Sequence, residues 1–137
     1  MTNQNAPVIS FEGYRIANLE YKAYSEENFI KRSSEVDMTK FKVEISMDFE
    51  NRISQIKITV NFANEKNLQI GLLTFLGQFK IGDAVTDEEE ARKYLLTNGT
   101  AIMFPYVRSL VSMITALDKG DVTVLPTFNF SSGFQEE

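Results

Sequence analysis

The sequence predicts an α+β domain: a four-stranded antiparallel sheet with two C-terminal helices packed on one side. Four segments within residues 8–81 have the alternation or the apolar composition of strands, whereas the apolar residues of the last third recur at helical spacing. A length of 137 residues suits one domain with one core. We therefore expect a single domain over residues 1–137, with an ordered core at about residues 8–130.

The first strand is expected over residues 8–24, and its apolar pattern changes phase twice. Its apolar residues form three successive pairs, which are Ile9 and Phe11, Tyr14 and Ile16, and Leu19 and Tyr21. The first and third pairs stand at odd positions and the second pair stands at even positions. Because a slip of one residue moves every later side chain to the opposite face of a sheet, these changes indicate two β-bulges, near Gly13 and near Asn18. A strand bent in this way is expected at an edge of the sheet.

Residues 25–38 are charged and irregular, and we expect them to form a long connection. Residues 39–49 and 53–62 then alternate apolar and polar side chains around a tight turn at 50–52. This pattern predicts a hairpin with one solvated face. Its inward side chains are Phe41, Val43, Ile45, Met47, Phe49, Ile56, Ile58, Val60 and Phe62.

The fourth strand, expected over residues 68–81, is apolar on both faces. One parity holds Leu68, Ile70, Leu72 and Leu76, and the other holds Leu73, Phe75 and Phe79. A strand that is apolar on both faces must be covered on both. Because one helix layer covers one face, we expect the second face to meet another copy of the chain or a bound partner.

Two helices are expected after the sheet. The first begins with Thr86 as its N-cap, since Glu89 three residues later completes a capping box, and it is expected to stop at Asn98–Gly99. The main helix is expected within Thr100–Lys119, with a kink if it extends upstream of Pro105. The apolar seam of this helix consists of Met103, Val107, Leu110, Ile114 and Leu117. Gly120 is its expected stop.

Charge and composition exclude several classes of function. A net charge of −5 and a pI near 4.8 mean that most of the surface repels the phosphate backbone of a nucleic acid, so we expect no nucleic-acid partner. The chain has no Cys and no His, and therefore lacks the side chains of thiolate and Ser-His-Asp nucleophiles and of nearly all zinc sites. The acidic run at residues 87–90 is explained by a helix start. We expect no enzyme activity, no metal site and no cofactor.

The expected location is the cytoplasm. No apolar run approaches the roughly 18 to 20 residues that span a bilayer, so we expect no membrane insertion. The first ten residues lack the basic start and apolar middle of a secretory signal.

Aromatic residues are over-represented, with 11 Phe and 5 Tyr. One sheet and one helix layer do not comfortably bury so many rings, so some are expected at interfaces. Contacts between copies of the chain and an open groove for extended apolar peptides explain the surplus about equally well, and the two explanations are compatible.

The C-terminal third carries a recognisable motif. Its elements are Met103-Phe104-Pro105-Tyr106, Arg108, Ser112-Met113, Gly120, Leu125-Pro126 and Asn129-Phe130. This run resembles the signature of SecB, the export chaperone, and Phe11 and Arg15-Ile16 resemble the opening of that family. The order of elements is similar as well, and the resemblance spans residues 9–130.

The resemblance implies an ATP-independent holdase that binds unfolded polypeptides in apolar grooves, assembles as a dimer or a tetramer, and passes its clients to SecA for export. Phe and Met side chains suit such promiscuous binding, and shallow subsites repeated by symmetry hold a client by multivalency. We assign docking of SecA to Glu20, which matches an acidic position of the family. We assign the peptide groove to Tyr24, Phe29, Leu72, Phe75, Phe79, Met103, Phe104 and Phe128.

Two positions depart from the family pattern. Leu72 and Tyr24 stand where the family has acidic side chains that receive the basic tail of SecA. The alternatives to an export chaperone are a dedicated chaperone of one client, such as an antitoxin or a phage protein, and an interaction domain of the same fold that binds a small molecule.

Overall fold

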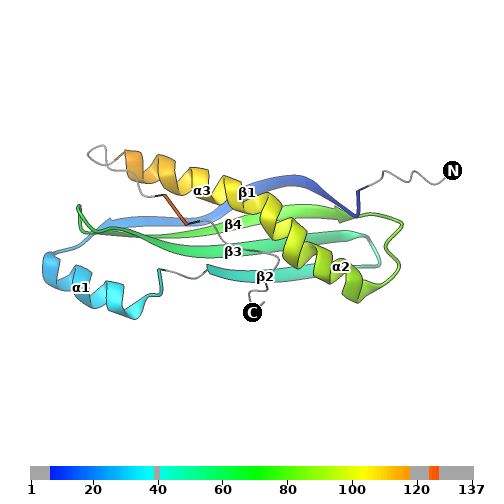
Figure 1. The fold of residues 1–137 in the computed structure, drawn as a ribbon, viewed down its shortest axis with the longest axis horizontal. Coiled ribbons are helices and arrows are strands. Elements are labelled where there is room, and N and C mark those ends of the chain that lie inside the picture. The colour runs from blue at the N-terminus through cyan, green and yellow to red at the C-terminus, as the bar shows by residue number, and fades with distance from the viewer. Residues whose placement is uncertain (1–6, 39–40, 118–123, 127–137) are drawn as a thin grey trace.

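The computed structural model describes residues 7–38, 41–117 and 124–126. Within these residues, one strand is followed by a helix and then by three more strands (Figure 1). After the fourth strand come two α-helices joined by a π-helical turn. The elements are β1 Ile9–Ala23, α1 Glu26–Glu35, β2 Phe41–Asp48, β3 Ile53–Asn64, β4 Gln69–Ile81, α2 Glu88–Tyr94, the π-helical turn Leu95–Gly99 and α3 Thr100–Ala116. Because α2 and α3 lie across one face of an antiparallel sheet, the predicted α+β fold is confirmed.

The described strands pair in the order β1-β4-β3-β2, and every pair is antiparallel. β1 lies at an edge, as predicted. Its register against β4 shifts at Glu12 and again at Ala17, and neither residue has a register partner on β4. These shifts adjoin Gly13 and Asn18, so both predicted bulges are confirmed.

The predicted hairpin is formed by β2 and β3. Val43 lies opposite Ile58, and the register runs without a shift along the whole of β2. The turn between the strands is closed by Arg52, which has a positive φ of 58° and donates its backbone N–H to the carbonyl of Phe49 at 3.2 Å. The inward side chains of β3 are at most 2% exposed, namely Ile56, Ile58, Val60 and Phe62.

The core lies between the sheet and the helix layer. Its largest fully buried side chains are Phe62, Phe75, Phe79, Phe104, Ile56, Ile58, Leu73, Leu95, Met103, Val43, Val107 and Val111. Each contributes about 1.5–3 kcal/mol when it leaves water. Gly77 allows α3 to approach β4 closely, because a Cβ at this position would lie 2.6 Å from Sδ of Met103.

The start of α2 differs from the prediction by one residue. Asp87 is the N-cap, and its carboxylate accepts a hydrogen bond from the backbone N–H of Glu89 at 3.2 Å. The predicted capping box between Thr86 and Glu89 is therefore wrong. Glu88, Glu89 and Glu90 do occupy the first turn, where they complement the positive end of the helix dipole as predicted.

The predicted stop at Asn98–Gly99 is also wrong. Gly99 has helical φ and ψ angles of −62° and −45°, and it leads directly into α3. Packing explains the glycine, because a Cβ there would lie 2.6 Å from Cδ1 of Ile56. Pro105 lies inside α3, within the predicted main helix, whereas its predicted stop at Gly120 lies outside the described residues.

The connection expected at residues 25–38 contains a helix instead. Ser25 caps α1 and accepts the backbone N–H of Asn28 at 3.2 Å, and Glu26 and Glu27 occupy the first turn. Phe29 is the buried residue of α1, at 8% exposed. A single buried side chain leaves too little apolar periodicity for the sequence to reveal this helix.

On the second face of β4, two apolar side chains are buried within the single chain, whereas Leu72 is half-buried. Ile70 and Leu76 are each 6% exposed, although neither belongs to the main core between the sheet and α3. α1 contacts β4, and Leu76 lies in register between Arg15 and Lys57, whose long aliphatic stems shield apolar neighbours. The prediction that this face requires another chain is therefore wrong for these two side chains.

Candidate functional site

The most exposed apolar surface of the sheet lies on β1. Tyr14, Ile16 and Leu19 are 52%, 43% and 42% exposed. They lie on the helix-facing side of the sheet, since their register partners on β4 are Gly77, Phe75 and Leu73. The two bulges produce this arrangement, because each inserted residue returns the following apolar side chains to the same face.

One flank of α3 continues this surface. Ile102, Tyr106, Met113 and Leu117 recur at steps of four, seven and four, and all are exposed, Met113 at 65%. Tyr106 joins the flank to β1, because its ring centroid lies 5.2 Å from that of Tyr14. We call the combined surface the β1–α3 strip, which consists of Tyr14, Ile16, Leu19, Ile102, Tyr106, Met113 and Leu117.

An aromatic cluster supports the middle of the strip. The ring of Phe11 lies 5.2 Å from Phe79 and 5.6 Å from Tyr106, and the ring of Tyr14 lies 5.0 Å from Phe75. Each such pair contributes about 0.5–1.5 kcal/mol beyond area burial. The ring of Tyr14 therefore rests on the buried Phe75, and the ring of Tyr106 rests on the half-buried Phe11.

The residues assigned to the peptide groove do not form one surface. Phe75, Phe79, Met103 and Phe104 are at most 2% exposed and belong to the core, so contact with a client would require α3 to leave the sheet. Phe29 is buried on α1, and Phe128 lies outside the described residues. The half-buried residues are Tyr24 and Leu72.

The strip residues missed by the groove assignment did have a signal in the sequence. Tyr14 and Ile16 follow the first bulge, and their parity change marks them as candidates for the helix-facing side. Tyr106 and Met113 lie in the family-like motif, on a flank beside the buried seam of α3. The sequence did not reveal how far the helix layer extends over the edge strand.

Glu20 lies on the outer face of the sheet, opposite Leu72. Its carboxylate forms an ion pair with Nζ of Lys22 at 3.2 Å and accepts a hydrogen bond from Nδ2 of Asn18 at 3.3 Å. The hydrogen bond with Lys22, followed by that with Asn18, lowers the pKa of Glu20. The acid therefore stays ionised, but a neighbouring cation balances its charge.

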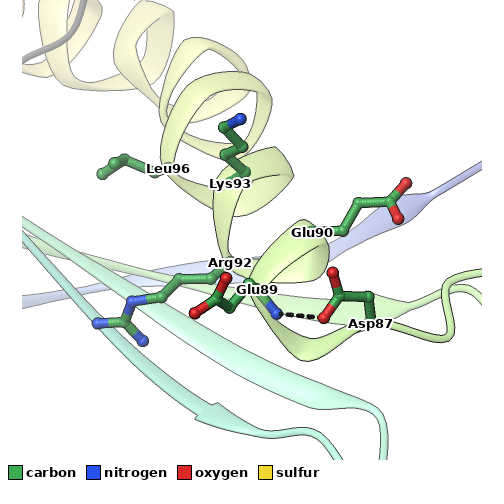
Figure 2. A pocket seen from close by; sticks show the side chains of 6 residues that line it. All are labelled: Asp87, Glu89, Glu90, Arg92, Lys93 and Leu96. Carbon is green, nitrogen blue, oxygen red and sulfur yellow. Dashed lines mark hydrogen bonds between the residues drawn. The ribbon is translucent and has the colours of Figure 1, made fainter.

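A shallow hollow of about 580 Å³ lies beside α2 (Figure 2). Its lining has both signs of charge, from Asp87, Glu89, Glu90, Arg92, Lys93 and Leu96. Asp87 is already used as the helix cap. Among the described residues, no three acidic side chains lie together so as to hold a metal ion, and no helix is long and apolar enough to cross a membrane.

The sheet order and the long helix after β4 define a SecB-like fold, and comparison with known structures establishes it. The SecB-like chaperone Rv1957 of Mycobacterium tuberculosis, solved in complex with a ChAD peptide from the Rv1956 HigA1 antitoxin, matches with a TM-score of 0.65 at 14% identity, over 88% of this chain and 91% of that one. A protein of unknown function from Streptococcus agalactiae matches with a TM-score of 0.60 at 15% identity, over 88% and 97%.

The likeness is structural. No protein-family model matches the sequence, and no curated protein sequence matches it either. The protein thus has a divergent SecB-like fold, as the resemblance in the C-terminal third predicted.

Proposed function

We propose that the protein is a molecular chaperone that holds non-native polypeptide on the β1–α3 strip without using nucleotide. The observation that carries this proposal is the strip itself, in which seven large apolar side chains are between 39% and 88% exposed. Apolar surface gathered in this way marks a site of interaction with protein chains. The fold supports the proposal, because a protein of the same fold is described as a chaperone bound to a peptide.

The chemistry of the strip suits a variable client. Tyr14 and Tyr106 offer rigid apolar rings with a polar end, and Met113 offers a flexible, polarisable side chain. Burial of one apolar side chain gains about 1.5–3 kcal/mol, whereas association costs at least about 4 kcal/mol. Several subsites must therefore act together, which favours extended segments rich in apolar residues.

Suppression of aggregation tests this proposal. The purified protein at stoichiometric amounts should keep a chemically unfolded client soluble in the absence of nucleotide. Ile16→Ser and Met113→Ser remove exposed strip side chains and should weaken suppression severalfold. Ile30→Ser is the matched control, since Ile30 is 63% exposed on α1, outside the strip. No suppression at several-fold excess, or equal loss in the control, would contradict the proposal.

A second candidate has the same fold and site but one client. The antitoxin peptide bound to the structural neighbour favours it. Pull-down from cells distinguishes the two candidates, because a dedicated chaperone should retain one dominant protein and a general holdase should retain many. Ile16→Ser should reduce capture in either case.

Export and assembly are further parts of the proposal. We expect a cytoplasmic homo-oligomer, a dimer or a tetramer, that delivers clients to SecA through Glu20. Glu20→Lys should then weaken SecA binding while client holding is unchanged. The strip combines a strand edge with a helix flank, so a second copy that covers part of it is compatible with the resemblance.

A further inference from the structure

Arg108 is the only charged residue among the 17 residues of α3. It is half-buried, and its Nε is enclosed without a hydrogen-bond partner. The ion pairs between described residues are formed by other cations, on β1, on α1 and on the β2–β3 hairpin. A donor that is enclosed without an acceptor costs free energy, and the cost is greater for a charged group. Arg108 therefore has hydrogen-bond donors to offer a ligand.

Arg108 lies on the flank of α3 that faces β2. The ring of Phe104, one helical turn earlier, lies 5.2 Å from the ring of Phe41 on β2. Residues four positions apart share one face of a helix, so Arg108 follows Phe104 on this flank. The ring of Tyr106 instead lies 5.2 Å from that of Tyr14 on β1. The arginine and the β1–α3 strip are therefore on different flanks of the same helix.

A hollow of about 480 Å³, which we call the Arg108 hollow, lies between α3 and residues 124–126. Its lining consists of Pro105, Arg108, Ser109, Ser112, Met113 and Val124. The hydroxyls of Ser109 and Ser112 place further donors near the guanidinium. None of the described residues that line the hollow is acidic. Because Met113 belongs to this lining and also to the β1–α3 strip, the hollow adjoins the strip.

We infer that the Arg108 hollow binds a carboxylate of the polypeptide held on the strip, either an acidic side chain or a C-terminal carboxylate. This inference rests on the proposed function. A guanidinium presents its donors in a planar fork that matches the two oxygens of a carboxylate. A single cation suits a group with one negative charge, whereas a phosphate group carries nearly two. The net charge of −5 further disfavours the more highly charged group.

The distance between the two sites fixes the spacing that a client needs. Arg108 and Met113 are five positions apart on α3, which corresponds to about 7.5 Å along the helix axis. A helix with its side chains is about 10–12 Å wide, so the two side chains lie at most about 15 Å apart. An extended polypeptide covers this distance with about four or five residues. The hollow therefore selects clients with a carboxylate at this distance from an apolar side chain.

Binding of matched peptides, followed by fluorescence anisotropy, tests the inference. Three labelled peptides with blocked ends share one apolar segment and differ about five residues beyond it. The first has Glu at this position, the second has Gln, and the third ends there with a free carboxylate. The protein should bind at least one of the two carboxylate peptides about fivefold more tightly than the Gln peptide, and the better ligand identifies the source of the carboxylate. Added salt should reduce the preference, because ions screen the charge of Arg108.

Variants of Arg108 assign the preference to the hollow. Arg108→Gln should abolish the preference and leave the affinity for the Gln peptide unchanged, which also shows that the variant is folded. Arg108→Lys keeps the charge but loses the planar fork, so it should retain part of the preference. Arg32→Gln is the matched control, because Arg32 lies on α1 and is paired with Glu35 at 3.3 Å. This control should bind all three peptides as the wild type does.

The outcomes separate this inference from the proposed function. Equal affinity for the three peptides, or a preference that persists in Arg108→Gln, would overturn the inference. Binding of the Gln peptide that Met113→Ser weakens would still support the strip in that case. If no peptide binds, both the inference and the proposed function are wrong. A dimer that is lost in Arg108→Gln, without any preference among the peptides, would place a carboxylate of a second copy in the hollow and would also overturn the inference.

Discussion

Replacement of Gly71 by alanine tests the pairing of the two central strands. Gly71 of β4 lies opposite Phe62 of β3, and the phenylalanine ring covers the glycine. A Cβ at position 71 would come within 2.2 Å of Cζ and 2.3 Å of Cε2 of this ring. The ring cannot move freely, because it is 2% exposed and stacks on Tyr21 at a centroid distance of 5.7 Å.

The expected loss of stability follows from these contacts. Overpacking of a core costs about 1–3 kcal/mol, and displacement of the ring also weakens an aromatic pair worth about 0.5–1.5 kcal/mol. Alanine regains about 0.5–1 kcal/mol relative to glycine inside a strand. Gly71→Ala should therefore lower the free energy of unfolding by about 2 kcal/mol, which is roughly a 30-fold change in the folding equilibrium.

Urea unfolding followed by circular dichroism measures this loss at a fixed protein concentration. Phe62→Leu provides the control, since the smaller side chain makes room for the new methyl group. The double variant Gly71→Ala with Phe62→Leu should therefore lose less stability than the sum of the two single variants. If Gly71→Ala lies within about 0.5 kcal/mol of the wild type, as surface substitutions do, the ring does not pack on position 71 and the β3–β4 register is wrong.

Three further predictions concern the core, the helix start and pH. Met103→Ala should cost about 2–5 kcal/mol in urea unfolding, because Met103 is fully buried against β4; a change in client holding without this loss would contradict its place in the core. Asp87→Ala should cost about 1 kcal/mol through loss of the α2 cap, whereas Thr86→Ala should stay within about 0.5 kcal/mol. The hydrogen bond with Lys57 lowers the pKa of Glu44 below its ordinary value of 4.5. The ionised Glu44 therefore stabilises the folded protein fully above pH 4.5, and this contribution is lost as the pH falls below that value and Glu44 becomes protonated. Glu44→Gln should therefore make stability less dependent on pH below 4.5, and an unchanged acid profile would refute the assignment.

The sheet could be predicted from the sequence because its patterns have a local cause. Side chains alternate along β2 and β3, and a phase change in β1 has no other simple origin than an inserted residue. Both bulges, the edge position of β1 and the turn closed by Arg52 follow from rules that operate within a few residues. The β-structure therefore needed no knowledge of the tertiary packing.

The wrong predictions concern segments whose structure depends on contacts with residues far away in the sequence. Asn98–Gly99 has the sequence of a helix stop, but Ile56 of β3 requires the absence of a side chain at Gly99 while the helix continues. α1 buries Phe29 and little else, so no periodicity marks it. The outer face of β4 looked unpartnered because neither α1 nor the stems of Arg15 and Lys57 could be placed over it.

The excess of aromatic residues indicated exposed apolar surface, but the topology decides where that surface lies. A central strand such as β4 has neighbours on both sides, so Ile70 and Leu76 are buried and Leu72 is half-buried even where no long helix crosses them. An edge strand has neighbours on one side only, and β1 presents its apolar side chains where α3 covers it least, which leaves Tyr14, Ile16 and Leu19 open. Without the two bulges, alternation would move part of this set to the outer face. The bulges that bend β1 therefore also assemble the apolar surface on which the proposed chaperone function depends.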